Sequence, residues 1–142
     1  RLWRSGAELA VPLATVELAG RDIERVLVWA GATLQAPHRA MAAQRGIQPD
    51  GVFIAFFMYG SPASRYKLWA GRRITEVDGI PVPDLDAFIR AVSGRPDRSS
   101  LRLKTVSWND AVEVITLRLD RHYWPAYELR RSNGGWQRVP LE

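Results

Sequence analysis

The sequence predicts a mainly β fold with short helices, a partly open β-barrel or sandwich of about five to six strands and two to three helices. Three observations carry this expectation. Residues 52–58 form a continuous apolar run, which is typical of a strand at the centre of a sheet. Residues 101–108 and 111–119 alternate apolar and polar side chains and are joined by Asn109-Asp110, which predicts a hairpin. Residues 84–93 instead repeat apolar side chains with the period of a helix.

The composition indicates one globular domain. Of 142 residues, 46% are hydrophobic and 25% are charged, and there is no cysteine, which excludes disulfides and thiolate chemistry. The net charge is +5, and Lys67 and Lys104 are the only lysines among 20 basic residues. The arginines are scattered along the chain rather than clustered on one element. We therefore expect a solvated surface with a mild preference for acidic partners, and no nucleic-acid partner.

The chain carries no recognisable targeting segment. No apolar run approaches the ~20 residues that a membrane helix needs, so no membrane partner is expected. The chain begins with Arg1 rather than methionine and shows no signal-peptide pattern. We therefore expect a fragment of a longer protein, whose compartment the sequence leaves open.

The N-terminal residues predict β structure. Ser5-Gly6 predicts the turn of a hairpin within residues 1–20, and residues 8–18 form an extended run that we expect to belong to a sheet. Pro12 inside that run favours an edge strand or a bulge. After a lead-in segment, residues 26–33 are nearly all apolar or small, which predicts a segment buried on both faces.

Two features frame the central strand. Pro37 and Gly46 bracket a short helix, and His38 is expected in its first turn. The aromatic residues of the run 52–58 are expected to pack in the core. The next stretch, residues 60–79, carries several local structural signals.

This stretch combines several local signals. Pro62 suits the first position of a helical turn, because its missing N–H would be unpaired there in any case. Gly71 supplies a position that tolerates positive φ, and Asp78-Gly79 is a strong hairpin turn. We expect a turn, one helical turn, a second turn, a short strand and a tight hairpin turn.

Local signals also predict a last helix and a C-terminal hairpin. The Asp84 side chain is expected to cap the helix, and Ser93-Gly94 to end it. Its apolar stripe comprises Leu85, Phe88, Ile89 and Val92. The aromatic-rich tail, residues 120–142, predicts a small hairpin around Asn133-Gly134-Gly135 that packs on the domain through its aromatic side chains.

No catalytic chemistry stands out. A serine-protease triad needs a histidine between a serine and a carboxylate, and neither His38 nor His122 lies in a recognisable protease motif. The sequence has no metal-ligand spacing and no phosphate-binding loop. We therefore expect no enzyme activity from this chain, no cofactor and no metal.

The order of signals in 60–79 resembles the signature of PDZ domains, in which G-S-P-A, an apolar residue, G-D-x-I and V-N/D-G follow one another. Arg72 stands where that family usually has aspartate. The segments 83–99 and 119–136 further resemble the large duplicated HtrA-like serine proteases of fungi and plants. The resemblance implies a regulatory or substrate-recognition PDZ module, whose parent protein is a serine endopeptidase. It carries over no catalytic residue, since no part of this chain matches the protease domain.

The resemblance also implies a peptide site. PDZ domains add an extended peptide to a sheet edge and hold its terminal carboxylate in a nest of backbone N–H groups. Residues 28–32 look like the aromatic–x–Gly–apolar loop of HtrA-type PDZ domains. The expected peptide-binding residues lie in this loop, in the following extended segment 32–35, and on the facing helix: Trp29, Ala30, Gly31, Ala32, Thr33, Leu34, Val82, Asp86 and Ile89.

Details of that site leave alternatives open. Ala30 and Ala32 replace larger aliphatic residues, so the pocket for the terminal side chain is either roomier or closed by Trp29. Trp29 can instead be a core tryptophan, with Gly31 only a bulge. Asp86 would disfavour acidic ligand residues and favour a basic or hydrogen-bonding one. Replacing Gly31 by valine is expected to abolish binding and to leave the fold largely intact.

The expected domain layout has three parts. Residues 1–20 are an N-terminal strand or the end of a preceding module, 21–119 are the PDZ domain, and 120–142 are a C-terminal extension. The expected partners are peptides or unfolded-protein segments, including C-termini, and the neighbouring protease and PDZ domains of the same chain. A stand-alone scaffold PDZ domain and, with less support, a small basic nucleic-acid-binding barrel are the alternative classes.

Overall fold

The computed structural model describes residues 1–15, 23–46, 49–132 and 134–141. Its strands are β1 (Leu2–Arg4), β2 (Ala7–Leu9), β3 (Arg25–Trp29), β4 (Ala32–Gln35), β5 (Val52–Phe57), β6 (Arg73–Val77), β7 (Ile80–Pro81), β8 (Ser100–Val106), β9 (Val112–Arg118), β10 (Tyr127–Ser132) and β11 (Gly135–Pro140). Its helices are α1 (Arg39–Arg45), α2 (Pro62–Arg65) and α3 (Leu85–Val92). A mainly β fold with short helices is confirmed.

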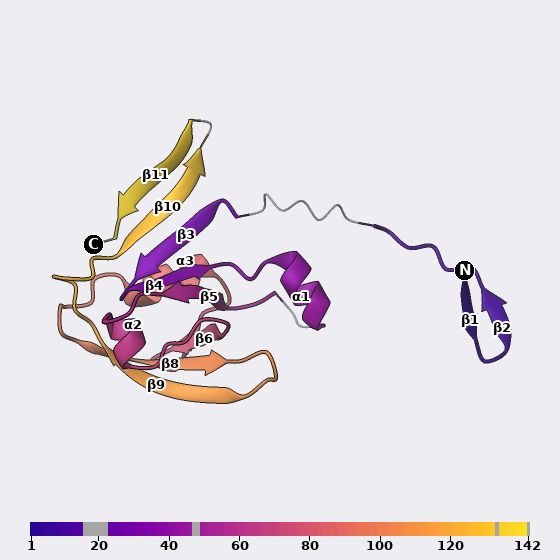
Figure 1. Ribbon diagram of the computed structural model, residues 1–142, viewed down its shortest axis with the longest axis horizontal. Helices are drawn as coiled ribbons and strands as arrows, with labels where there is room; N and C mark the ends of the chain where they lie inside the picture. Colours follow the sequence, from indigo (N-terminus) through magenta and orange to yellow (C-terminus); the bar gives the residue numbers. More distant parts are fainter. Residues whose placement is uncertain (16–22, 47–48, 133, 142) are drawn as a thin grey trace.

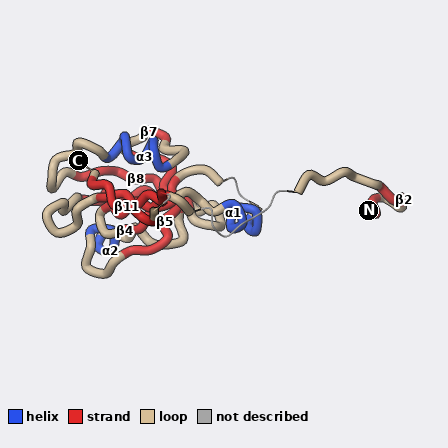
Figure 2. Tube along the Cα trace, turned by 90° about the horizontal axis from the view of Figure 1, so that it is seen from above, coloured by secondary structure: helices blue, strands red, loops and turns tan. Residues whose placement is uncertain are grey.

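Nine of the strands form one antiparallel sheet in the order β11-β10-β3-β4-β5-β6-β8-β9, with β7 paired to β6 (Figure 1). This sheet is open, because its outer strands β11 and β9 lie at opposite ends of the order. It also has more strands than the sequence predicts, because the β3–β4 hairpin and the tail both join it. Helices α3 and α2 lie on opposite sides of the sheet (Figure 2).

Local signals place the helix ends as expected, with one correction. Asp84 caps α3, its Oδ1 accepting from the N–H of Ala87 at 2.7 Å. Pro62 occupies the first turn of α2. His38 does not lie within α1 but caps it, since its Nδ1 accepts from the N–H of Ala40 at 3.2 Å. None of the described helices is long and apolar enough to cross a membrane.

The fully buried side chains of β5 are aliphatic and not aromatic. Val52 and Ile54 are fully buried, whereas Phe56 is 56% exposed. The expectation that the aromatic residues of this run pack in the core is therefore wrong for Phe56, whereas Phe57 is partly buried and packs against the core. Strand alternation turns every second side chain away from the core, and a bulge opposite Thr33 and Leu34 shifts the register after Ile54.

The N-terminal hairpin is confirmed, but the long strand after it is not. β1 and β2 pair only with each other around Ser5-Gly6, as a separate two-stranded sheet. Residues 10–15 form no strand, and every residue of 1–15 is exposed. The remainder of the predicted run, 16–18, lies outside the described residues. The described part of the run has no buried face and therefore nothing to hold it as a strand.

The tail forms the predicted hairpin but attaches differently from the prediction. β10 pairs with β11 on one side and with β3 on the other, from Tyr127↔Val28 to Arg130↔Arg25. Tyr123 and Trp136 are 70% and 51% exposed and do not anchor the tail, whereas Trp124 is partly buried beside Gly31. Backbone pairing with β3 joins the tail to the main sheet.

Candidate peptide-binding site

The predicted carboxylate loop is a two-residue hairpin turn. β3 and β4 pair directly across it, with Trp29 opposite Ala32. Ala30 and Gly31 have φ angles of 51° and 79°, the positive values that a type I′ turn requires at both central positions. The sequence did not predict this hairpin, because the favoured first residue of such a turn is asparagine or aspartate and not alanine. An Ala-Gly pair between two apolar runs was the available signal.

The turn is held from both sides. The carbonyl of Ala30 accepts from the N–H of Ala63 at 2.9 Å, and that of Gly31 accepts from Met58 at 2.8 Å. A Cβ on Gly31 would lie 2.1 Å from the Cβ of Ser61 and 3.1 Å from the Trp124 ring. The expectation that valine at this position leaves the fold intact is therefore wrong, because the glycine is needed for packing as well as for its φ.

Strand β4 has no free edge. It pairs with β3 on one side and with β5 on the other, and Ala32 and Leu34 are fully buried. A peptide therefore cannot add to the segment 32–35 while β3 is in place, and the expectation of an open edge there is wrong.

Helix α3 faces β3 at the place where a peptide was expected. Trp29, only 3% exposed, packs edge-on against Phe88 with ring centroids 5.2 Å apart. Trp29 is thus a core residue, which agrees with the alternative interpretation of the sequence. Val82 is also fully buried, Ile89 is half-buried, and Asp86 is exposed at the helix surface. Only Asp86 and Ile89 of the three predicted helix-side residues have surface that a ligand could reach in this arrangement.

A charge cluster ties β3 to both of its neighbours. Arg25 donates from Nη2 to Asp86 Oδ1 on α3 at 2.6 Å and from Nε to Glu128 Oε1 on β10 at 2.5 Å. Arg130 donates to the second oxygen of Glu128 at 2.8 Å. Sequence reasoning missed Arg25 and Glu128, because 103 positions separate them and no local pattern relates them.

The cluster is stabilised in its ionised form. Burial raises the pKa of the Glu128 carboxyl, but hydrogen bonds from Arg130 and Arg25 outweigh that effect and lower its pKa below 4.5. The hydrogen bond from Arg25 lowers the pKa of Asp86 below 3.8. Hydrogen bonds to Asp86 and Glu128 raise the pKa of Arg25, so Arg25, Asp86 and Glu128 are charged at neutral pH.

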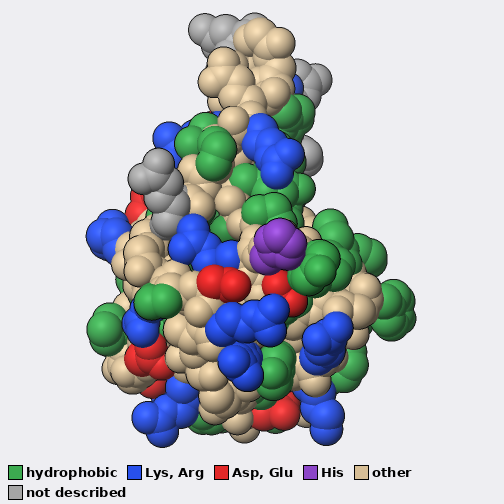
Figure 3. All heavy atoms as spheres, turned by 90° about the vertical axis from the view of Figure 1, so that its left-hand side faces the viewer, with side chains coloured by type: hydrophobic (Ala, Val, Ile, Leu, Met, Phe, Trp, Pro, Cys, Tyr) green, Lys and Arg blue, Asp and Glu red, His purple; other side chains and the backbone are tan. Residues whose placement is uncertain are grey.

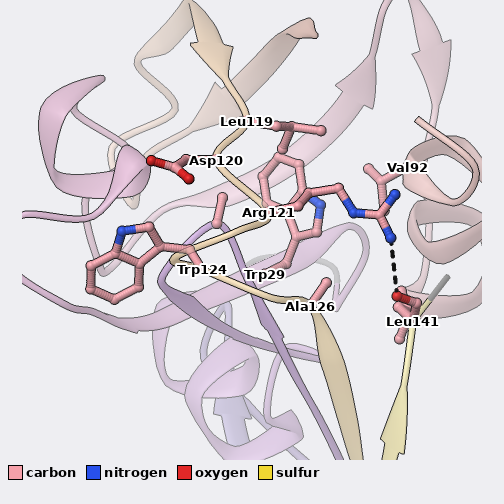
Figure 4. Close-up of a pocket in the computed structure, with 9 residues that line it drawn as sticks. Trp29, Val92, Leu119, Asp120, Arg121, Trp124, Ala126 and Leu141 are labelled. Atoms are coloured by element: carbon pink, nitrogen blue, oxygen red, sulfur yellow. Dashed lines mark hydrogen bonds between the residues drawn. The ribbon is translucent and has the colours of Figure 1, made fainter. Parts of the chain in front are cut away.

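The space beside the hairpin turn is too small for a peptide side chain. Trp29, Trp124 and Arg121 line a cavity of about 20 Å³, which is the room of one water molecule (Figure 4). One guanidinium nitrogen of Arg121 donates to the carbonyl of Leu141 at 3.3 Å and closes this side (Figure 4).

No metal cluster is found among the described residues, and the face shown in Figure 3 carries side chains of both charges. No three His, Cys, Asp or Glu side chains among those residues lie where they could hold a metal. On the face in Figure 3, basic side chains are interspersed with acidic and hydrophobic ones. Several arginines, among them Arg25, Arg95 and Arg130, are engaged in ion pairs.

Comparison with known proteins identifies the class. The family model of the PDZ-like domain matches residues 22–98, more than half of the chain, and the chain therefore belongs to that family. It is homologous to HtrA-like proteases: Protease Do-like 7 of Arabidopsis thaliana is 40% identical over 132 residues, covering 91% of this chain and 12% of that protein. Pro-apoptotic serine protease nma111 of Aspergillus oryzae is 34% identical over 139 residues, covering 96% of this chain and 14% of that protein.

Solved structures agree with the fold. The HtrA-type protease AlgW with decapeptide superimposes with a TM-score of 0.57 at 19% identity, covering 67% of this chain and 29% of that one. At this identity the likeness concerns the fold alone. The chain spans only 12% and 14% of the length of the two relatives named above.

Proposed function

We propose that this chain is a peptide-binding module of an HtrA-like serine protease, which regulates the enzyme or recognises its substrates. It takes an extended peptide or a C-terminus as a strand beside β4 and α3, in exchange for β3, which holds that position in this structure. The observation that supports this function best is that β3 already lies in that position, antiparallel to β4. An extended backbone therefore fits between β4 and the side chains of α3.

The direction of β3 agrees with capture of a C-terminus. β3 runs toward the Ala30–Gly31 turn, so a peptide in the same direction brings its carboxylate to that turn. Backbone N–H groups of a turn with consecutive positive φ angles form a concave site for an anion. The Aspergillus relative is named as a serine protease and AlgW was solved with a decapeptide, and both facts support the same function.

The remaining parts of the proposal concern the parent protein. The neighbouring protease and PDZ domains of the same polypeptide are the proposed partners of this module. The hydrolytic residues belong to the protease domain, and we expect the isolated chain to cleave no peptide bond.

The first prediction is that extended peptides bind this chain through their C-terminus. We expect a Kd around micromolar (~8 kcal/mol), because a short peptide loses much freedom when it is ordered. Amidation should weaken binding about tenfold, which is the loss of one charge-assisted contact. Fluorescence anisotropy with labelled peptides, each with a free or an amidated C-terminus, measures both quantities.

The control separates the proposed site from the remaining surface. Ile89→Ala on α3 should weaken binding, whereas Ile80→Ala on the exposed β7 should not. Equal affinity for free and amidated peptides would remove carboxylate capture and leave strand addition. No binding by any extended peptide would overturn the proposed function.

A further inference from the structure

We propose that β3 is a built-in ligand of the position between β4 and α3, and that this position binds peptides with the side-chain pattern of β3. That pattern is a basic residue, an apolar residue two positions later and an aromatic residue two positions after that. The inference rests on the proposed function and specifies its ligand. We call the place that β3 occupies the β3 slot.

Described elements border the β3 slot along both edges and on the face toward α3. β4 lies along one edge with Leu27↔Leu34, Val28↔Thr33 and Trp29↔Ala32, and β10 lies along the other. A peptide that adds as a strand to β4 from the α3 side would occupy this same ladder. β3 and an external peptide therefore compete for one set of backbone partners.

The inward face of β3 defines which side chains the slot accepts. Arg25, Leu27 and Trp29 alternate with Val26 and Val28, so they share one face of the strand. Leu27 is fully buried, and Trp29 packs against Phe88 of α3. A ligand that replaces β3 must fill these two apolar positions, since leaving them empty would expose core residues to water.

The ion pairs of Arg25 define the third position of the ligand pattern, which is basic. The Arg25 guanidinium meets Asp86 on α3 and Glu128 on β10, both at hydrogen-bond distance. When β3 leaves, these two carboxylates remain at the slot, and a basic ligand residue pairs with them. An acidic residue at the same position would repel both carboxylates.

The hinge of such an exchange is the turn after β3. Ala30 holds a φ of 51°, which is unfavourable for a residue with a Cβ. The chain therefore contains a competing strand, and β3 keeps the affinity for external peptides modest.

The test uses a labelled peptide with the sequence of residues 23–29, Ile-Glu-Arg-Val-Leu-Val-Trp, with a free C-terminus. Arg25→Ala in the protein weakens the built-in strand while the peptide keeps its own arginine, so affinity should rise about tenfold. If Arg25 only supported the fold, or contacted the peptide directly, its removal would lower the affinity for the peptide instead. The control is Arg72→Ala, which removes an ion pair with Glu113 away from the slot and should leave affinity unchanged.

A disulfide lock supplies the second arm. The chain has no cysteine, so Val28→Cys with Thr33→Cys introduces a single pair. The Val28–Thr33 pair lies next to the hydrogen-bonded Trp29–Ala32 pair and is therefore a non-hydrogen-bonded pair. In such a pair the Cβ atoms lie close enough for a disulfide. Oxidation should abolish peptide binding and reduction should restore it. Val106→Cys with Val112→Cys, at the start of the β8–β9 hairpin, should show no redox effect.

The outcomes separate the two proposals. Equal binding by the locked and reduced forms overturns the β3 slot and leaves the proposed function standing, because the peptide then binds elsewhere. No binding by any form or any peptide overturns both. Dimerisation of the reduced variant without peptide binding assigns the slot to β3 of a second copy and overturns the peptide inference. Circular dichroism of each variant verifies that the comparison is made on folded protein.

Discussion

At the scale of single residues, the most informative side chain is Glu128. Glu128 and Arg73 are the charged residues that are buried in the described part of the chain. Only 2% of the Glu128 side chain is exposed, and it accepts hydrogen bonds from Arg25 and Arg130. A buried carboxylate without partners would be strongly destabilising, so these two arginines are required by the burial of Glu128. The cluster joins β3 to the tail strand and, through Arg25, to α3.

The second prediction is that Glu128→Gln lowers the free energy of unfolding by about 1–3 kcal/mol at pH 7, because it leaves charged donors poorly paired. Since folding lowers the pKa of Glu128 below 4.5, its contribution is present above that value and is lost as pH falls through the folded-state pKa. The difference between wild type and variant should therefore shrink in acid. Urea unfolding between pH 7 and pH 2 measures it.

The control is Glu113→Gln. Glu113 pairs with Arg72 but its side chain is 40% exposed, so the same change should cost less than about 0.5 kcal/mol. Equal losses at the two glutamates would show that the Glu128 cluster has no special weight.

At the scale of elements, two hairpins share one kind of turn. Ala30-Gly31 joins β3 to β4 and Asp78-Gly79 joins β6 to β7, and the four φ angles are 51°, 79°, 51° and 81°. Asp78-Gly79 was predicted from the sequence and is confirmed. The two turns differ in their surroundings, because a Cβ on Gly79 meets nothing within 4 Å.

The third prediction compares alanine at these two glycines. Gly79→Ala should cost about 1–2 kcal/mol, the cost of positive φ for a residue with a Cβ. Gly31→Ala should cost at least about 2 kcal/mol more, because its Cβ would also collide with Ser61. Thermal and urea unfolding of the two variants isolates the packing term. Equal costs would mean that Ser61 can move away without penalty.

At the scale of the whole molecule, the question is which parts belong to one folding unit. The proposed layout places the PDZ domain at 21–119, between an N-terminal segment and a C-terminal extension. Residues 1–15 are exposed throughout and β1 and β2 pair only with each other. The tail strand β10, by contrast, covers one edge of β3 and contributes the buried Glu128.

The fourth prediction is that removal of residues 1–15 changes the free energy of unfolding by less than about 0.5 kcal/mol, as expected where no buried group is lost. Removal of residues 120–142 should instead strongly destabilise the protein, because it exposes the edge of β3 and removes the carboxylate that pairs with Arg25. Calorimetry of the two truncated chains decides the matter. A stable protein without residues 120–142 would make the tail a mere appendage.

The sequence alone determined the fold class, the family and most local features. Pro62, Asp84 and Asp78-Gly79 act through backbone groups only a few residues away, so their signals can be read locally. The alternating runs likewise predicted the β8–β9 hairpin. For the candidate site, the sequence predicted the glycine-containing loop and the facing helix as neighbours of a ligand position.

Only the tertiary structure decided what fills that position. β4 has no free edge because β3 pairs with it through a two-residue hairpin, whose Ala-Gly turn is a weak sequence signal. The outer edge of β3 is covered in turn by β10, from about 100 residues away, a distance over which no short pattern carries information. Burial of Glu128 and Trp29 follows from the same pairing. A strand pattern specifies which face is apolar, but the choice of neighbouring strand is a property of the whole sheet.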